Sequence, residues 1–467
     1  MVDRSQSPDV LVIGGGPAGY VAAIRLAQLG KRVALVEKDR PGGVCLNWGC
    51  IPVKSLLHAA EIVRNAAEGR RMGLTFGAPG IDIVSLFGWK GRVVDRLVRG
   101  IEYLFKANGV ELIRGEARFS APGVVMVTTP DGDLELEAGA FVIATGSRPK
   151  QLPCVPFDGQ KVINSDDAVG LVELPARLVV IGAGVVGLEF ATVFGRLGCK
   201  VEVLEVCDQI LPGTDPDVAS SLQKSMAREG IGIHLGVKVQ GVGSDAGLSV
   251  RYLDGDEEKT MEADKVLVAV GRVPLSDKVG LEWAGVKTDK DGWVKVDAGY
   301  RTSAEDVYAA GDVIGGQLLA HKAMAEGISL AERLAAGKPW KFRAVPSCVY
   351  TDPEVAVVGL TEVEARDRGI DVKLARVPLS AVGRSLTLGR SEGFCKMIVD
   401  PKTDRVLGVG MVAPQADALI AEAALAVELG LTAEKVGRVV HPHPTMSELL
   451  FEAAEAIHGR AVHIANR

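Results

Sequence analysis

The sequence lacks the marks of secreted, membrane-spanning and nucleic-acid-binding proteins. Its 467 residues include seven cysteines at scattered positions, an odd number that fits no secreted disulfide framework. No stretch approaches the roughly 20 apolar residues that a membrane span needs. The net charge of -6 offers no general basic surface for nucleic acid. These absences predict a globular protein of a reducing, cytoplasmic compartment, with no membrane and no nucleic-acid partner.

Targeting and metal-binding signals are missing as well. Residues 1–8 are short and polar and hold no apolar core of a secretory signal. The spacing of histidines and cysteines matches no zinc motif, so we expect no metal. Histidines 58, 234, 458 and 463 have no chemical context and are interpreted as structural.

Glycine, in contrast, is abundant, and six positions near the N-terminus form a recognisable loop. An apolar strand at residues 9–13 precedes Gly-Gly-Gly-Pro-Ala-Gly, a helix follows, and a second strand ends at Glu37. Gly14 permits the tight turn, Gly16 lets a pyrophosphate approach the backbone, and Gly19 lets the helix pack on the strand. Glu37 can accept hydrogen bonds from a ribose. The context of strand, loop, helix and acid makes this dinucleotide fingerprint specific.

The same unit recurs 168 positions later. Gly182, Gly184 and Gly187 form the second loop, and Glu205 closes its second strand. Two fingerprints predict two dinucleotide sites, because a turn without a ligand has no reason to repeat in this detail. No arginine follows Glu205 to meet a 2′-phosphate, so NAD is favoured over NADP at the second site.

Between the two fingerprints, residues 42–54 place two cysteines five positions apart. Cys50 precedes a helical pattern with Pro52 in its first turn, where free N–H groups and the dipole favour a thiolate. Lys54 adds positive charge. The alternative is a pair of buried structural cysteines. A redox dithiol beside two dinucleotide sites instead suggests a flavin and a nicotinamide nucleotide that pass electrons between them.

A second chemical signal lies near the C-terminus, in His-Pro-His-Pro-Thr-Met-Ser-Glu at residues 441–448. Dithiol–disulfide exchange needs a proton acceptor near neutral pH, which imidazole supplies, and a carboxylate can orient it. The alternative is that these histidines are ordinary surface or core residues.

The remaining pattern predicts the domain organisation. Apolar strands ending in glycine at 141–149 and 266–274 suggest boundaries after each, with a linker at 151–167. Asp306–Asp312 is a strand ending in Gly-Asp, followed by a helix at 321–336. From Val345 the alternation is antiparallel, with helices expected at 417–429 and 445–457.

These motifs together resemble the pyridine nucleotide–disulfide oxidoreductases, and within them most closely the dihydrolipoamide dehydrogenases. The resemblance implies a flavin-dependent homodimer that reoxidises protein-bound dihydrolipoamide, passing electrons through a Cys45–Cys50 disulfide and FAD to NAD+. The implied partner is a lipoylated carrier protein or a 2-oxoacid dehydrogenase complex. No fused lipoyl domain is expected, because no extra segment precedes the first fingerprint.

The resemblance also implies roles for the reactive residues. Cys45 is expected to exchange with substrate and Cys50 to lie next to the flavin. His443 is the expected base and Glu448 its orienting acid, both acting on the cysteines of the other subunit. His441 is either a supporting residue or a plain loop residue.

The same resemblance implies the fold class and the cofactor contacts. We expect an α/β protein with two Rossmann-like dinucleotide-binding domains, for FAD at 1–149 and for NAD at 150–274. A segment at 275–345 would return to the FAD domain, and an α+β dimerisation domain would occupy 346–467. The expected FAD contacts are Gly14, Gly16, Gly19, Glu37, Lys54, Gly115, Ala117, Thr145, Gly146, Ser147, Gly311, Asp312, Leu318, Leu319, Ala320 and His321. The expected NAD contacts are Gly182, Gly184, Gly187, Glu189, Glu205 and Gly271.

Several alternatives stay open at this point. Asp312 could be an ordinary turn aspartate and Glu189 a helix-surface acid. A glutathione-reductase-like enzyme should carry basic residues after the second fingerprint, a mercuric reductase usually adds a C-terminal cysteine pair, and a soluble transhydrogenase lacks the two-cysteine signature. A purely structural subunit of a lipoyl complex would not need all of Cys45, Cys50, His443 and Glu448.

Overall fold

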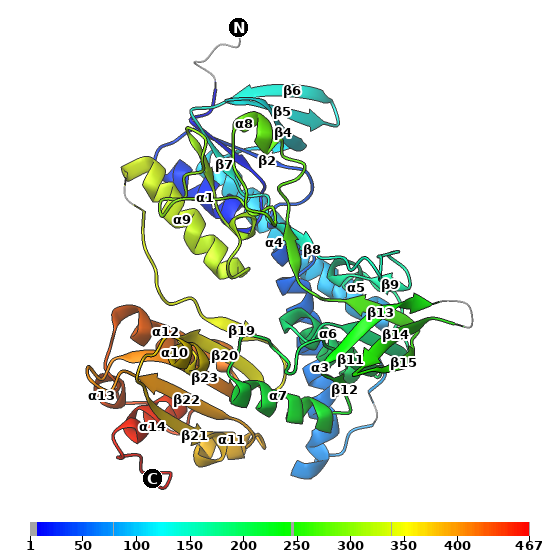
Figure 1. Ribbon diagram of the computed structural model, residues 1–467, viewed down its shortest axis with the longest axis vertical. Coiled ribbons are helices and arrows are strands. Elements are labelled where there is room, and N and C mark those ends of the chain that lie inside the picture. The colour runs from blue at the N-terminus through cyan, green and yellow to red at the C-terminus, as the bar shows by residue number, and fades with distance from the viewer. Residues whose placement is uncertain (1–6, 78, 244–246, 338, 467) are drawn as a thin grey trace.

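The computed structural model describes residues 7–77, 79–243, 247–337 and 339–466. The prediction for residues 1–8 therefore falls mostly outside the described residues. Figure 1 shows three lobes, and we name them by their sheets: the first lobe surrounds β2 and β7, the second surrounds β11 and β13–β15, and the third surrounds β20–β23. The predicted α/β class with two Rossmann-like units and an α+β C-terminal part is confirmed.

The first lobe is built on a parallel sheet with strand order β18-β7-β1-β2-β3. β1, β2, β7 and β18 are almost entirely buried apolar runs, as expected for a parallel sheet covered on both faces, whereas the edge strand β3 is only partly buried. The strands are β1 (Val10–Ile13), β2 (Val33–Glu37), β3 (Glu111–Arg114), β7 (Ala140–Ile143) and β18 (Val307–Ala309). β18 comes from far along the chain and pairs in parallel with β7.

Two helices from distant parts of the sequence pack closely on this sheet. α1 (Pro17–Gln28) joins β1 to β2, and α9 (Ala320–Ala336) lies beside it (Figure 1). Small residues make the contact possible: a Cβ on Gly327 would come within 2.5 Å of the Ala18 carbonyl oxygen. α9 begins one residue before the predicted start at His321, with Leu319 as its N-cap. The other helices of this part are α2 (Gly43–Asn47), α4 (Ile83–Asn108), α8 (Leu281–Ala284) and η2 (Asp312–Ile314). α3 (Cys50–Glu68) and η1 (Gly69–Met72) extend toward the second lobe, where buried residues of α3 join that lobe's core.

The second lobe repeats the architecture, with strand order β12-β11-β10-β16-β9. Its strands are β9 (Val162–Ile163), β10 (Arg177–Ile181), β11 (Lys200–Leu204), β12 (Gly232–His234) and β16 (Lys265–Val268). Its helices are α5 (Ser165–Ala168), α6 (Val185–Arg196) and α7 (Pro216–Arg228). The prediction that residues 151–167 form only a linker is wrong: Val162 and Ile163 are buried and pair in parallel with β16. Two residues were too short a run for a strand signal.

Three smaller sheets accompany the two large ones. A two-stranded antiparallel ribbon of β8 (Ser147–Pro149) and β17 (Arg272–Pro274) connects the first two lobes. One three-stranded sheet consists of β4 (Glu116–Ala121), β5 (Val124–Thr129) and β6 (Gly132–Glu137). The other consists of β13 (Val237–Gly243), β14 (Ser249–Asp254) and β15 (Glu257–Glu262).

The third lobe is an antiparallel sheet with order β19-β20-β23-β22-β21, as the alternation predicted. Its strands are β19 (Ser347–Val349), β20 (Glu354–Gly359), β21 (Lys373–Pro378), β22 (Phe394–Val399) and β23 (Val406–Ala413). Its helices are α10 (Glu362–Asp367), η3 (Leu379–Ala381), α11 (Gly383–Thr387), α12 (Ala416–Leu429), α13 (Ala433–Gly437) and α14 (Glu448–Ile457). α14 begins three residues later than predicted, because the N–H and hydroxyl of Thr445 bond to Glu448 and Pro442 in a loop.

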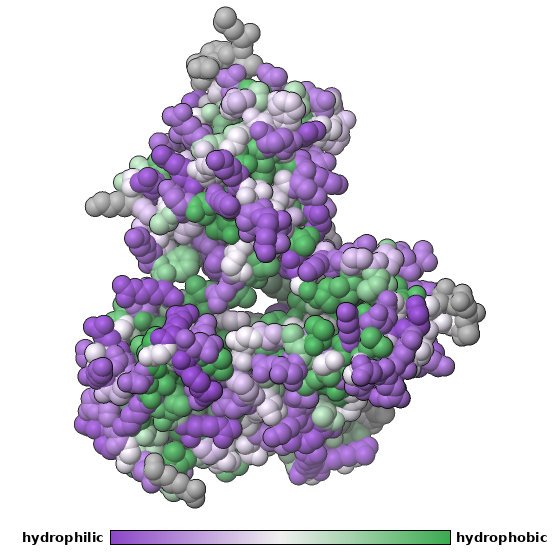
Figure 2. Space-filling view, viewed as in Figure 1, coloured by the Kyte–Doolittle hydropathy of each residue, from purple (hydrophilic) through white to green (hydrophobic). Residues whose placement is uncertain are grey.

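The surface is mainly polar. Figure 2 shows hydrophilic residues over most of this face, with apolar patches on the third lobe and near the junction of the lobes. Among the described helices, none combines the length and the apolar character that crossing a membrane requires.

Candidate active site

The segment with the two cysteines is docked on the first glycine loop. Gly42 and Gly43 have φ angles of 100° and 58°, and the Gly42 N–H donates a hydrogen bond of 2.8 Å to the carbonyl of Gly15. A Cβ on Gly43 would lie 2.6 Å from the Cα of Gly16. Glycine at both positions permits the positive φ angles, and the missing Cβ of Gly43 lets α2 approach the predicted flavin pyrophosphate site with no side chain between them.

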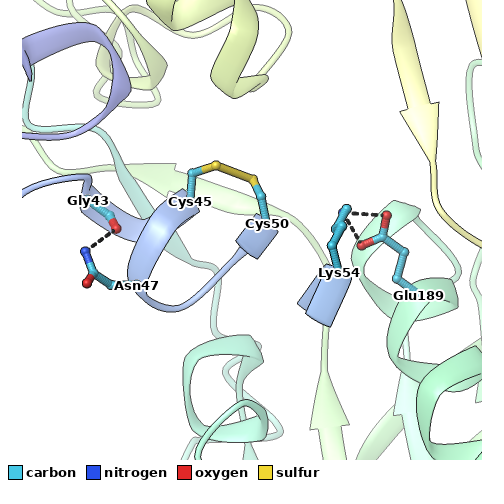
Figure 3. Close-up of a disulfide and its surroundings, with 6 residues drawn as sticks. All are labelled: Gly43, Cys45, Asn47, Cys50, Lys54 and Glu189. Carbon is cyan, nitrogen blue, oxygen red and sulfur yellow. Dashed lines mark hydrogen bonds and ion pairs between the residues drawn. A yellow bond between two sulfur atoms is a disulfide. The ribbon is translucent and has the colours of Figure 1, made fainter. Parts of the chain in front are cut away.

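Cys45 and Cys50 form a disulfide between α2 and the start of α3 (Figure 3). Their Cα atoms are 4.6 Å apart, and both residues are only partly buried. Cys50 is the first residue of α3, so its sulfur lies in the field of the helix N-terminus as predicted. Their partial exposure argues against the alternative of a pair of buried structural cysteines. A half-buried disulfide at a helix start is open to a thiol substrate and can release a stabilised thiolate.

Asn47 fastens the short helix that carries Cys45, and the sequence interpretation missed it. Its buried side-chain amide donates to the carbonyl of Gly43 at 3.0 Å and lies 3.2 Å from that of Pro41. Figure 3 shows this amide on the side of α2 opposite the disulfide. Asparagine two residues after the first cysteine was the available signal.

Lys54 and Glu189 meet one helical turn beyond Cys50. The Lys54 ammonium lies 2.8 Å from both carboxylate oxygens of Glu189, in α6 of the second lobe (Figure 3). The Tyr350 N–H donates to the same carboxylate at 3.1 Å, and the ammonium lies 4.3 Å from the centre of the Tyr350 ring. Glu189 is buried, so the helix-surface alternative is excluded. Residues of α3, the second lobe and the third lobe thus converge on one ion pair. The role of Lys54 at the Cys50 thiolate stays a prediction.

The first fingerprint has the geometry that its residues predicted. Gly14 has a φ of 101°, and a Cβ on Gly19 would overlap the Gly14 carbonyl oxygen. Glu37 accepts hydrogen bonds from the N–H groups of Gly15 at 2.7 Å and Asp39 at 2.9 Å. The carboxylate therefore lies at the mouth of the loop, where a ribose would be recognised.

The second fingerprint reproduces these contacts residue for residue. Gly182 has a φ of 106°, and a Cβ on Gly187 would overlap its carbonyl oxygen. Glu205 accepts from the N–H groups of Ala183 at 2.7 Å and Cys207 at 2.9 Å, each 168 positions after its counterpart. A cavity of about 700 Å³ opens here and is lined by Gly182, Gly184, Glu205 and Gly271, among others. Its size and its glycine floor fit a dinucleotide.

The Gly-Asp turn places Asp312 at the carboxyl ends of the first sheet's strands, where the first glycine loop also lies, because β18, β7 and β1 are parallel. Gly311 has a φ of 80° and Asp312 follows β18 directly. The Asp312 carboxylate accepts a hydrogen bond of 2.6 Å from the hydroxyl of Ser147, which lies after β7. Thr145 donates its hydroxyl to the Leu275 carbonyl at 2.6 Å. Asp312 is therefore held by a side chain from another strand, which an ordinary turn aspartate does not need.

The remaining predicted FAD contacts lie at the edges of the same lobe. The Gly115 N–H donates to the Glu37 carbonyl at 3.1 Å, and a Cβ there would meet the Thr128 carbonyl oxygen at 2.6 Å. Ala117 is buried in β4. Leu318 and Leu319 lead into α9, whose first turn holds Ala320 and His321; the His321 ring contacts the Pro346 carbonyl at 2.7 Å. These residues are positioned on the first lobe, and their cofactor contacts stay predictions.

His443 and Glu448 form the predicted pair at the start of α14. The His443 Nδ1 lies 2.8 Å from Glu448 Oε1, and the Thr445 N–H donates to Oε2 at 2.9 Å. Burial opposes ionisation of Glu448, yet the hydrogen bonds from His443 and Thr445 lower the pKa of its carboxyl. The His443 side chain is 74% exposed. Glu448 thus fixes one ring nitrogen and leaves the other edge of the imidazole facing outward.

His441 is a buried, paired residue. Its Nε2 lies 3.0 Å from Glu422 in α12, and its Nδ1 lies 2.9 Å from the Val439 carbonyl. Its side chain is only 5% exposed, so it is not a plain loop residue. Its contacts join the loop before His443 to α12.

The histidine pair and the disulfide lie in different parts of one chain. Figure 1 draws α14 at the far end of the third lobe, well away from α3. Within one chain, His443 and the Cys45–Cys50 disulfide therefore do not form a joint site.

Comparison with known proteins decides the family. The family model for "Pyridine nucleotide-disulphide oxidoreductase" matches residues 8–327, and the model for its dimerisation domain matches residues 345–454. The chain belongs to this family. The dimerisation model covers the third lobe, including the oxidoreductase's His443 and Glu448.

Relatives and solved structures resemble this oxidoreductase over nearly its full length. The dihydrolipoyl dehydrogenase of Thermus scotoductus is 49% identical over 98% of this chain and 99% of its own. The mitochondrial dihydrolipoyl dehydrogenase of Pisum sativum is 42% identical over 98% and 93%. Among structures, LpdA of Mycobacterium tuberculosis has a TM-score of 0.88 at 29% identity, covering 96% of this chain and 99% of that one. RclA of Escherichia coli, an HOCl-induced flavoprotein disulfide reductase, has a TM-score of 0.86 at 29% identity, covering 96% and 99%.

Proposed function

We propose that this protein is an FAD- and NAD-dependent dihydrolipoyl dehydrogenase, acting as a homodimer on the dihydrolipoyl group of a carrier protein. The observation that carries the proposal is the Cys45–Cys50 disulfide at the start of α3, docked on the first of two matching dinucleotide loops. A dithiol centre next to one nucleotide site, with a second site in the next lobe, serves electron transfer from a thiol to a nicotinamide nucleotide.

FAD, when bound, carries the electron pair from the dithiol to NAD+. The first lobe would hold FAD through Gly14, Gly16, Glu37 and Asp312. The glycine loop that contains Gly14 and Gly16 is free of side chains where α2 approaches it. The second lobe would hold NAD+ through its glycine loop and Glu205. The domain boundaries proposed after residues 149, 274 and 345 follow from this division.

The residues around the disulfide define an exchange sequence. One substrate thiol loses its proton to His443, and the resulting thiolate attacks Cys45, forming a mixed disulfide and releasing Cys50 as a thiolate. The second substrate thiol then attacks the substrate sulfur of the mixed disulfide and passes its proton to the departing Cys45 sulfur, so Cys45 leaves as a thiol and lipoamide leaves with a new internal disulfide. The helix N-terminus stabilises the Cys50 thiolate, and Glu448 holds the protonated imidazole.

The base is supplied by the partner subunit in this proposal. His443 is exposed on the lobe that matches the dimerisation model and lies away from the disulfide of its own chain. A second copy that presents this lobe to the first lobe would complete two equivalent sites. We also place the enzyme in the cytoplasm, because all five other cysteines of the described chain remain free thiols.

The test is turnover of the purified, yellow holoenzyme with dihydrolipoamide. We expect NAD+ to be reduced and NADP+ to have a kcat/KM about 100-fold lower, because Glu205 repels a 2′-phosphate. Substituting Glu205→Ser should narrow this preference for NAD+, whereas Glu202→Ser, on the strand β11 that Glu205 follows, serves as the matched control. NADP+ working as well as NAD+ would contradict the cofactor assignment, and no NAD+ reduction would contradict the function.

A further inference from the structure

The ribbon between the first two lobes carries two arginines with different environments. β8 and β17 pair so that Val273 lies opposite Arg148 and Arg272 opposite Pro149. Arg148 forms a surface ion pair with Asp277, with both its contacts at 2.9 Å. Arg272 instead turns inward, and burial lowers the pKa of its guanidinium although Asp166 and Asp312 favour its charge.

One side of Arg272 is bonded to Ser147 of the first lobe. Its Nε donates to the Ser147 hydroxyl at 2.7 Å and its Nη2 to the Ser147 carbonyl at 2.7 Å. The hydroxyl has one proton, which it donates to Asp312 at 2.6 Å. The guanidinium therefore fixes the direction of a hydrogen-bond chain, in which Arg272 donates to Ser147 and Ser147 donates to Asp312.

The other side of Arg272 faces the second lobe. Arg272 and its neighbour Gly271 line the 700 Å³ cavity above the second glycine loop, together with Lys150 and Ser165. Asp166, beside Ser165 at the start of α5, is the second carboxylate whose charge acts on Arg272. One side chain thus belongs to the wall of one nucleotide site and to the hydrogen-bond chain of the other.

We propose that Arg272 is a positioning residue that couples the two nucleotide sites, transmitting occupancy of the NAD cavity through Ser147 to Asp312 and so to the flavin. The proposal rests on the proposed function for the identity of the two ligands. A bound nucleotide displaces water from the cavity wall, and charged hydrogen bonds strengthen when water is excluded. NAD+ binding therefore tightens the hold of Arg272 on Ser147 and changes the field at the flavin side.

The test uses the oxidised holoenzyme, which cannot reduce NAD+. Titration with NAD+ should perturb the flavin absorbance spectrum, while calorimetry measures NAD+ affinity independently. We expect Arg272→Met and Ser147→Ala to reduce the amplitude of the flavin difference spectrum, measured at NAD+ concentrations that saturate each variant, about fivefold or more. Arg148→Met, on the same ribbon, is the matched control and should behave as the wild type.

Each outcome has a defined meaning. Full amplitude in both Arg272→Met and Ser147→Ala, or no flavin response in a wild type that binds NAD+, overturns the coupling. If Arg272→Met is purified without FAD, the result of Ser147→Ala decides, because this variant leaves the cavity wall intact. Loss of FAD from both variants also overturns the proposal, since the hydrogen bonds from Arg272 through Ser147 to Asp312 would then serve only to retain the cofactor. A wild type that shows the flavin response without oxidising dihydrolipoamide contradicts the proposed function alone.

Discussion

At the scale of single residues, Glu448 determines how the proposed base is held. Its carboxylate bonds to the His443 ring and to the Thr445 N–H, and burial leaves it poorly solvated without them. Replacing the carboxylate removes the charge that balances an imidazolium and the contact that orients the ring.

We expect Glu448→Gln to slow oxidation of dihydrolipoamide by about 10- to 100-fold while FAD stays bound. Rapid mixing of the oxidised enzyme with dihydrolipoamide, followed by flavin absorbance, measures this step before NAD+ takes part. Glu455→Gln is the control, since Glu455 lies on the same helix but pairs with Arg460. A near-normal rate in Glu448→Gln would place the orienting group elsewhere.

At the scale of structural elements, a cluster of ion pairs joins α3, the helix that begins at Cys50, to the third lobe. Asp352 follows β19 and contacts Arg64 of α3, Arg196 of α6 at 3.0 Å and Arg390 at 2.7 Å. Burial opposes ionisation of Asp352, but the three arginines together lower the pKa of its carboxyl. The carboxylate holds three positive charges in a largely buried place.

We expect Asp352→Asn to reduce stability by about 3 kcal/mol near pH 7, because it leaves those charges unbalanced. The folded pKa is below the unfolded value of about 3.9, so this contribution is complete above that pH and is lost only as pH falls through the folded pKa. Urea unfolding of the wild type and of Asp352→Asn between pH 7 and 3.5 should show a difference in the free energy of unfolding that is constant at higher pH and narrows only below about pH 4.

Asp277→Asn provides the comparison, since its surface pair with Arg148 should contribute less than about 1 kcal/mol. If the stability difference between the wild type and Asp352→Asn already narrows between about pH 7 and 5, the ionisation of Asp352 does not account for that difference.

Local elements were largely predictable, and contacts between lobes were not. The fingerprints and the helix at Cys50 follow from glycine positions, apolar periodicity and proline in the first helical turn, all of which act over a few residues. Lys54 was expected near the thiolate, yet its partner is Glu189, 135 positions away. Arg272 gave no sequence signal, because its meaning depends on a ribbon that joins two lobes. Pairings of this kind are set by tertiary packing, which a local pattern does not record.

At the scale of the whole molecule, the proposed dimer predicts complementation between two inactive variants. Cys45→Ser removes the exchange thiol and His443→Gln removes the base, so each homodimer should have little dithiol oxidation. A heterodimer of the two would have one site with both defects and one site with neither.

We expect isolated heterodimers, purified with two different affinity tags, to recover about half of the wild-type activity per dimer. A mixture of the two homodimers that has not exchanged subunits is the control and should stay inactive. Heterodimers without activity would indicate that the base and the disulfide act within one chain.

The arrangement of the first lobe also affects how the protein is made. Its sheet is completed by β18 and its outer helix layer by α9, both of which follow the second lobe in the sequence. A nascent chain therefore exposes the unfinished edge and the face of α1 until residue 336 has left the ribosome. The second lobe, continuous in sequence, can fold earlier. During synthesis, the first lobe should accordingly bind its flavin late, after the second lobe has already folded.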